Sequence, residues 1–205
     1  MYMSDILCVT DSKLCRGDFL ERIGQIAACR PAGIILREKE MPPGDYEALA
    51  VRAIAICESY NVKLILLTHI GAAINLQAES IHLPLPYLRE MTALQKSHFK
   101  TIGASCHSTA DALEARMLGC TYITAGHIYE TDCKKGLPGR GLQFLGEICA
   151  AVDIPVYGIG GINASNAAQV RKTGAGICRM SSLMQTEDIP GLIAGCDPAL
   201  VHRVR

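Results

Sequence analysis

The stretch Ile6-Leu7-Cys8-Val9-Thr10, followed by apolar residues at helical spacing from Phe19 to Ala27, sets a pattern that the whole chain repeats. A short apolar, β-branched run predicts a buried strand, and the spacing after it predicts an amphipathic helix. The same strand-then-helix pattern returns along the sequence and gives eight units in all. The other predicted strands begin at Gly33, Lys63, Ser80, Lys100, Thr121, Pro155 and Gly176.

Strands that are apolar throughout, each separated from the next by a helix, indicate a parallel sheet covered on both faces. Eight such units predict a closed (β/α)8 TIM barrel, at the short end of lengths for this fold. An open doubly wound sheet is the alternative. The pattern also predicts single helices over 88–97 and 163–172. With 205 residues and 49% hydrophobic content, the chain is expected to form a single domain over residues 1–205.

Charge and hydropathy narrow the class of partner. The chain has 20 basic and 20 acidic residues and no basic run, which argues against nucleic-acid or membrane-surface binding. No apolar stretch reaches the roughly 18 to 20 residues of a membrane span. We therefore expect a cytoplasmic protein whose partner is a small molecule, with the question of a homo-oligomer left open.

The ten cysteines form no C-x-x-C pair, and most lie in apolar segments. Cysteine in that setting behaves as a small hydrophobic residue in a reducing compartment, so structural thiols are expected rather than disulfides or zinc. Cys106 and Cys133 lie beside polar loops and are the two candidates for a reactive thiol.

The barrel interpretation places function where strands end, because ligands of this fold bind at the C-terminal face. Arg37 and Lys39 follow the second strand and share one side, with Glu38 turned the other way, so both cations can meet an anionic substrate. Other strand ends also carry polar residues. They are Thr68-His69, Ser105-Cys106-His107, Gly126-His127 and Ser181-Ser182.

The richest of these positions is the loop His127–Gly141, which follows the sixth predicted strand and holds Glu130 and Lys134. A loop of this composition is as often solvated as functional, but its place at the barrel mouth favours contact with a ligand. Imidazole titrates near neutral pH, so His127 is the predicted proton-transfer group and His107 a weaker candidate. The remaining histidines other than His69 are interpreted as structural or surface residues: His82, His98 and His202.

Two turns predict a phosphate site. Gly160-Gly161 follows the seventh strand, and Met180-Ser181 follows the eighth. Glycines let backbone N–H groups approach an anion, and a helix N-terminus adds partial positive charge. The loops after strands seven and eight often bind phosphate in such barrels. We therefore predict that these four residues bind a substrate phosphate.

A divalent-metal site is not predicted. Mg²⁺ requires clustered oxygen ligands, whereas the chain offers Thr68-His69 after the third strand and Pro84-Leu85-Pro86-Tyr87 after the fourth. We therefore expect neither a metal nor another cofactor.

Taken together, several motifs resemble the thiamine phosphate synthase superfamily along essentially the whole chain. The resemblance implies a TIM barrel that joins a pyrimidine pyrophosphate to a thiazole phosphate using Mg²⁺. The metal-binding aspartates of that superfamily are absent here, so synthase activity is not expected. The motifs are Val9-Thr10-Asp11, Leu36-Arg37-Glu38-Lys39, His82-Leu83, Gly103-x-Ser105-x-His107-Ser108 and Ile159-Gly160-Gly161-Ile162.

The loop Gly126-His127-x-Tyr129-Glu130-Thr131-Asp132-Cys133-Lys134-Lys135-Gly136-Leu137-x-Gly139-Arg140-Gly141 resembles the corresponding loop of TenI-like thiazole tautomerases within this superfamily. This resemblance implies a thiamine-biosynthesis isomerase that aromatises a carboxythiazole phosphate tautomer without a cofactor. His127 would be its general acid/base.

The substrate of such an isomerase would be a phosphorylated thiazole whose carboxylate meets a cation of the mouth. Two alternatives stay open: a thiamine phosphate synthase with a degenerate metal site, and a non-catalytic barrel that binds a thiazole or phosphate ligand as a regulator. The residues expected to contact substrate are Arg37, Lys39, Lys134, Glu130, Ser105, His107 and Thr68.

Overall fold

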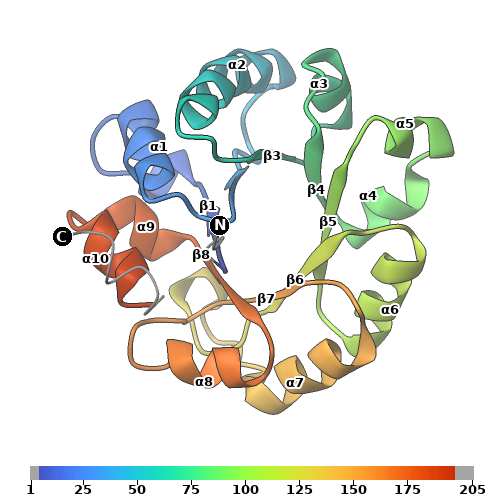
Figure 1. Cartoon of the computed structure of the whole chain (residues 1–205), viewed down its shortest axis with the longest axis vertical. Coiled ribbons are helices and arrows are strands. Elements are labelled where there is room, and N and C mark those ends of the chain that lie inside the picture. The colour runs from blue at the N-terminus through green and yellow to red at the C-terminus, as the bar shows by residue number, and fades with distance from the viewer. Residues whose placement is uncertain (1–4, 197–205) are drawn as a thin grey trace.

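The computed structural model describes residues 5–196, and these form a closed barrel of parallel strands surrounded by helices (Figure 1). Each strand pairs with the next along the chain, and β8 pairs with β1 to close the sheet. The predicted TIM barrel is confirmed, and the open doubly wound sheet is excluded. The strands are β1 Ile6–Val9, β2 Gly33–Leu36, β3 Leu64–Leu67, β4 Ser80–Pro84, β5 Thr101–Cys106, β6 Tyr122–Gly126, β7 Val156–Ile159 and β8 Gly176–Arg179.

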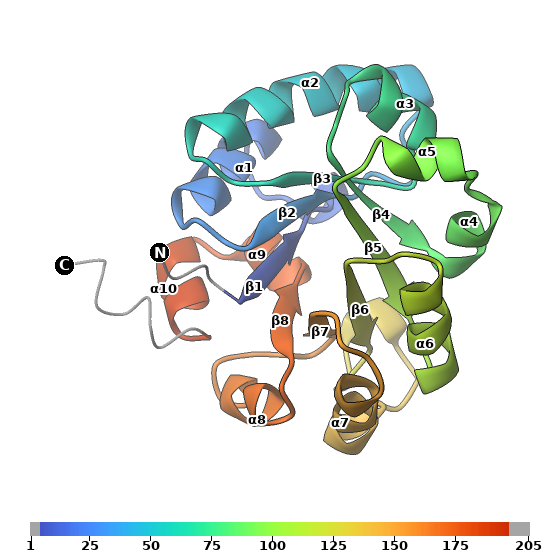
Figure 2. The same cartoon turned by 45° about the vertical axis from the view of Figure 1, so that its right-hand side comes forward.

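Helices cover the outer face of the sheet, and successive helices such as α1 and α2 or α6 and α7 pack side by side (Figure 2). Residues 1–4 and 197–205, the latter including His202, lie outside the described residues. The helices are α1 Phe19–Ala28, α2 Pro43–Ser59, α3 Ile70–Asn75, α4 Leu85–Glu90, α5 Ala93–Ser97, α6 Thr109–Met117, α7 Gly141–Ala151, α8 Ala167–Lys172, α9 Ser181–Gln185 and α10 Ile189–Ala194, with 3₁₀ turns η1 Ser12–Leu14 and η2 Asp132–Lys134.

Two expected helices differ from the structure because side chains bond to the backbone where apolar spacing suggested a continuous helix. The helix expected over 88–97 is broken at Thr92, which caps α5 reciprocally with Gln95. The helix expected over 163–172 begins only at Ala167, because Asn163 and Asn166 accept backbone hydrogen bonds that hold a turn.

The inside of the barrel has an apolar half and a polar half. Strands β1, β2 and β3 fill their side with aliphatic residues, among them Leu7, Ile35 and Ile65. Strands β4 and β5 instead place His82 and Ser105 next to β6, at 2.9 Å from each other. Such groups are stable in a dry interior only when they bond to one another.

Tyr122 fills the polar half because β5 carries a glycine beside it. A Cβ atom on Gly103 would lie 2.2 to 2.4 Å from three atoms of the Tyr122 side chain. The Tyr122 hydroxyl then reaches Nδ1 of His82 at 2.9 Å, and the ring of Tyr157 packs edge-on against Tyr122. Burial lowers the pKa of His82 to about 3, so this ring is neutral at physiological pH.

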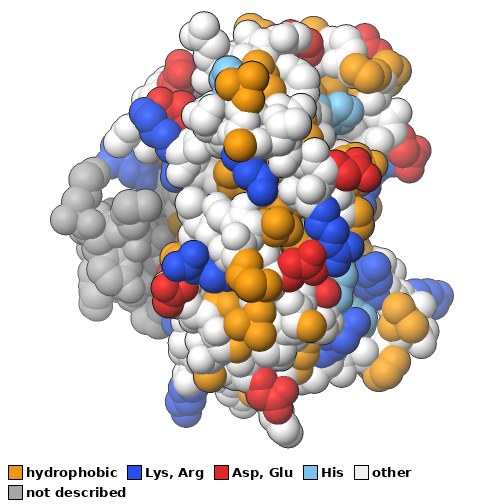
Figure 3. Space-filling model, turned by 90° about the vertical axis from the view of Figure 1, so that its right-hand side faces the viewer, with side chains coloured by type: hydrophobic (Ala, Val, Ile, Leu, Met, Phe, Trp, Pro, Cys, Tyr) orange, Lys and Arg blue, Asp and Glu red, His pale blue; other side chains and the backbone are white. Residues whose placement is uncertain are grey.

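The outer surface mixes charged and apolar side chains without one dominant patch on the face that carries α4, α5 and α6 (Figure 3). Leu94 and Met117 on this face are 74% and 79% exposed. Within residues 5–196, no helix has the length and apolar character needed to cross a membrane.

We expect Gly103→Ala to lower the free energy of unfolding by about 1 to 3 kcal/mol, because the added methyl group meets the Tyr122 ring in a closed barrel. Urea unfolding measures this change. Gly146→Ala is the matched control, because Gly146 lies in α7 with nothing within 4 Å of its Cβ position. That variant should be neutral or more stable by up to about 1 kcal/mol. Equal destabilisation of the two variants would contradict the packing argument.

Stability should also depend on pH through His82. Its pKa falls from 6.5 in the unfolded chain to about 3 in the folded protein. As pH drops from about 6.5 toward 3, the unfolded state alone binds the proton, so this group lowers the free energy of unfolding by about 1.4 kcal/mol per pH unit. Urea unfolding at pH 7 and pH 5, compared with His82→Gln, isolates the effect. An unchanged pH dependence in the variant would exclude it.

Candidate active site

Three cations gather at the C-terminal mouth of the barrel. Arg37 and Lys39 follow β2, and Lys134 lies in η2 after β6, the strand directly across the ring from β2. Partial desolvation, and then the charges of Arg37 and Lys134, lower the pKa of Lys39. The three predicted cations therefore lie close enough to interact, and together they favour an anion.

Two acids beside these cations, Asp11 and Glu38, already bond to protein groups. Asp11 holds Arg37 through a 2.5 Å ion pair. Glu38 turns away from the two cations, as alternation predicted, and is buried against the β1 end. It accepts hydrogen bonds from the Thr10 hydroxyl at 3.2 Å and from the Ser12 backbone N–H at 3.1 Å. These carboxylates fix the β1 and β2 ends relative to each other.

The loop after β6 is anchored to the loop after β7. Ile128 and Tyr129 donate backbone hydrogen bonds to the carbonyls of Ile159 and Gly160, at 2.9 and 3.1 Å. His127 lies within hydrogen-bond distance of its own loop, with Nε2 3.2 Å from the Leu137 carbonyl oxygen. The side chain of His127 therefore braces the loop that carries Lys134.

The glycine pair after β7 makes this anchoring possible. Gly160 and Gly161 have φ angles of +101° and +64°, and a Cβ on Gly161 would lie 2.4 Å from the Glu130 carbonyl oxygen. The sheet pairing of β7 with β8 ends at this glycine pair, where Ile159 lies opposite Cys178. The pair thus serves the loop contact, and a glycine turn of this kind leaves room for an anion to approach the backbone.

Ser105 and His107, at and just beyond the end of β5, have different surroundings. The Ser105 hydroxyl lies 2.9 Å from Nε2 of His82 and 3.5 Å from the Thr124 hydroxyl, just inside the mouth. His107 is exposed, with Nδ1 3.1 Å from the Gly126 carbonyl oxygen. Only Ser105 of the two is thus joined to the buried polar groups of the barrel.

The other predicted residues lie around the same rim. Thr68 follows β3 in a left-handed conformation, with φ +69°, and its N–H donates to the His82 carbonyl. Met180 caps α9 and Ser181 begins it. Glu130 is exposed on the loop after β6.

Sequence reasoning missed the residues beneath this rim. His82, Tyr122 and Thr124 were not singled out for function, although all are buried inside the barrel. The available signal was alternation along the strands, because Tyr122 and Thr124 lie two apart on β6 and share its inner face.

The residues at the mouth do not fit a Mg²⁺ ion. His69 follows β3 but stacks on Tyr46 at 4.0 Å between ring centroids. Strand β4 passes directly into α4 with Pro84 as its cap, so no acidic loop exists there. Across residues 5–196, no group of three or more His, Cys, Asp or Glu side chains is arranged to hold a metal.

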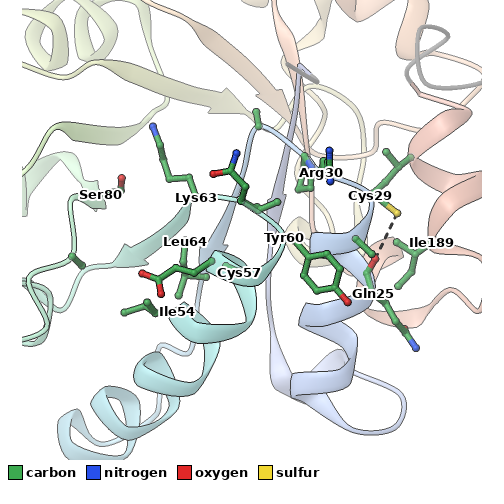
Figure 4. Close-up of a pocket in the computed structure, with 18 of the residues that line it drawn as sticks. Gln25, Cys29, Arg30, Ile54, Cys57, Tyr60, Lys63, Leu64, Ser80 and Ile189 are labelled. Atoms are coloured by element: carbon green, nitrogen blue, oxygen red, sulfur yellow. Dashed lines mark hydrogen bonds between the residues drawn. The ribbon is translucent and has the colours of Figure 1, made fainter. Parts of the chain in front are cut away.

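A hollow also lies at the opposite end of the barrel, and Figure 4 shows the residues that line it. It is a groove of about 1550 Å³ between the helix-to-strand turns that precede β2, β3 and β4, and it is lined by residues that include Cys29, Tyr60 and Lys63. In this fold the N-terminal end serves stability rather than catalysis. The mouth with the three cations is therefore the candidate active site.

The two thiols singled out from sequence differ in exposure. Cys106 is buried, and this burial raises its pKa to about 12, so it is not a thiolate at neutral pH. Cys133 is exposed beside Lys134.

We expect Gly161→Ala to loosen the loop after β6, because the added methyl group meets the Glu130 carbonyl. Amide hydrogen exchange of Ile128 and Tyr129 should become roughly tenfold faster or more, since strained backbone costs on the order of 1 to 3 kcal/mol. Gly136→Ala is the control, because Gly136 also has a positive φ but nothing lies within 4 Å of its Cβ position. Equal acceleration in both variants would show that the contact is not responsible.

Known proteins are similar to this chain along nearly its full length. A family profile, TMP-TENI, described as thiamine monophosphate synthase, matches residues 6–183. A protein named thiamine-phosphate synthase from Clostridium acetobutylicum is 36% identical over 186 residues, covering 88% of this chain and 87% of that protein. One of the same name from Ruminiclostridium cellulolyticum is 33% identical over 188 residues, covering 88% of each.

A solved structure is similar to this chain as well. Thiamine phosphate pyrophosphorylase from Pyrococcus furiosus superposes with a TM-score of 0.81 at 26% identity, covering 99% of this chain and 98% of that one.

These findings correct the expectation of a thiazole tautomerase. That expectation depended on one loop and on His127 as an acid/base, whereas whole-chain similarity is to proteins named for the synthase, a transferase. The expectation that missing metal-binding acids exclude the synthase is contradicted by the same similarity. With a profile match over most of its length and relatives above 30% identity, the chain belongs to the TMP-TENI family of thiamine monophosphate synthases.

Proposed function

We propose that this protein is a transferase that joins a pyrimidine pyrophosphate to a thiazole phosphate to give thiamine phosphate. The observation that carries the proposal is the group of Arg37, Lys39 and Lys134, whose charges interact at the mouth of the barrel. Full-length similarity to proteins named thiamine-phosphate synthase supports it.

The reaction breaks the C–O bond between the pyrimidine methylene and the pyrophosphate, whose oxygen keeps the electron pair. The thiazole nitrogen supplies the pair for the new C–N bond. Negative charge therefore grows on the leaving group, and the cations of the mouth stabilise it as it forms. Arg37 is fixed by Asp11, and Lys134 is held by the anchored loop, so little reorganisation is needed.

The second substrate carries a phosphate of its own. The glycine turn at Gly160 and Gly161, with the backbone of Met180 and Ser181 at the start of α9, is suited to bind it. This position lies beside the loop that carries Lys134, so the thiazole would enter next to the departing pyrophosphate. Thr68, Glu130 and His107 complete the polar rim.

We expect purified protein to form thiamine phosphate from both phosphorylated substrates, and to do so with EDTA present, because fixed cations neutralise the leaving group. Lys134→Gln should lower kcat/KM by roughly 10²-fold. Lys135→Gln is the control, since it removes the neighbouring lysine, which is not among the charges that shift the pKa of Lys39. Chromatographic detection of the product measures both rates.

Failure to form product with or without added Mg²⁺ would reject the proposed transferase. Product formed only with Mg²⁺ would keep the transferase but reject neutralisation by the cations alone. Equal losses in the two lysine variants would show a general charge effect rather than a specific site.

A further inference from the structure

A chain of polar groups connects the interior of the barrel to its mouth. It begins at the Tyr122 hydroxyl on β6, which lies 2.9 Å from Nδ1 of His82 on β4. Nε2 of the same ring lies 2.9 Å from the Ser105 hydroxyl on β5. Tyr122 and His82 are buried, whereas Ser105 is partly exposed toward the mouth.

The direction of the hydrogen bonds in this chain follows from satisfying the buried groups. A neutral imidazole donates from one nitrogen and accepts at the other. If Nδ1 donated to Tyr122, the tyrosine proton would have no acceptor among the described residues, because His82 is the hydroxyl's partner. A buried donor without a partner is costly. The Tyr122 hydroxyl therefore donates to Nδ1, and Nε2–H donates to Ser105.

This direction determines what Ser105 can offer a ligand. Its oxygen accepts from Nε2 of His82 and faces the Thr124 hydroxyl, which donates at 3.5 Å. With both lone pairs taken, the hydroxyl proton is the group left over, and it has no acceptor among the described residues. Ser105 is thus held as a donor.

We propose that His82 is a positioning residue that fixes the Ser105 hydroxyl as a hydrogen-bond donor to an acceptor atom on the heteroaromatic ring of the substrate. The ring end is favoured because Tyr122, where this chain of polar groups begins, belongs to an apolar cluster against which Ile159 and Met180 pack, whereas the cations that suit phosphates lie at the rim. The identity of the ring rests on the proposed function; the direction of the hydrogen bonds does not.

The tautomer is measured directly by ¹⁵N NMR of the histidine side chains, with His82→Gln used to assign the signal. We expect the ring to be neutral with the proton on Nε2 at pH 7. Tyr122→Phe removes the donor to Nδ1 and should add a population with the proton on Nδ1. A wild-type ring protonated on Nδ1, or charged at pH 7, would overturn the proposal whether or not the protein forms thiamine phosphate.

A double-variant cycle tests positioning against a merely structural role. His82→Leu cannot donate and should lower kcat/KM roughly tenfold, whereas His82→Gln retains an N–H and should recover most of the activity. In a Ser105→Ala background, His82→Leu should cause no further loss, because it acts through Ser105. Tyr157→Phe on β7 removes a tyrosine hydroxyl, as Tyr122→Phe does, and should leave kcat/KM unchanged.

Additive losses from His82→Leu and Ser105→Ala, each with a normal circular-dichroism spectrum, would overturn the positioning role. If the wild-type protein forms no product, the proposed transferase fails, and the NMR result alone then decides the direction of the hydrogen bonds.

Discussion

Closure of eight parallel strands into a ring is the constraint on which the rest of the structure depends. Every second side chain of a strand then points into a closed space, and a polar group there must bond to another protein group. Strands β1, β2 and β3 meet this constraint with aliphatic residues. Strands β4, β5 and β6 meet it with a hydrogen-bonded chain that ends at Ser105, so the packing of the core and the chemistry of the mouth share the same residues.

At the mouth, backbone contacts between two loops fix the position of the Lys134 charge. The loop after β6 carries Lys134, but what fixes that loop is its pair of hydrogen bonds to the β7 end and its close approach to Gly160 and Gly161. A lysine side chain is a flexible point charge, so its position is only as definite as the backbone beneath it. The two glycines predicted to bind an anion are thus also what allows the adjacent loop with Lys134 to be held in place.

Sequence patterns predicted the fold well because strand and helix periodicity are local. The eight strands were located correctly. Alternation along the chain also correctly predicted that Glu38 points away from Arg37. The break at Thr92 was missed because a capping side chain overrides apolar spacing. His82 was taken as structural because its partners, Tyr122 and Ser105, lie 40 and 23 residues away, and no local pattern joins them.

The error about function has a different physical origin. Absence of metal-binding acids was taken as absence of transferase chemistry, but a metal is one means of neutralising a leaving pyrophosphate and cationic side chains are another. At this mouth Asp11 pairs with Arg37, yet the charges of Arg37 and Lys134 still lower the pKa of Lys39. A mouth without metal-binding acids can therefore still present the positive charge that the proposed transferase would use.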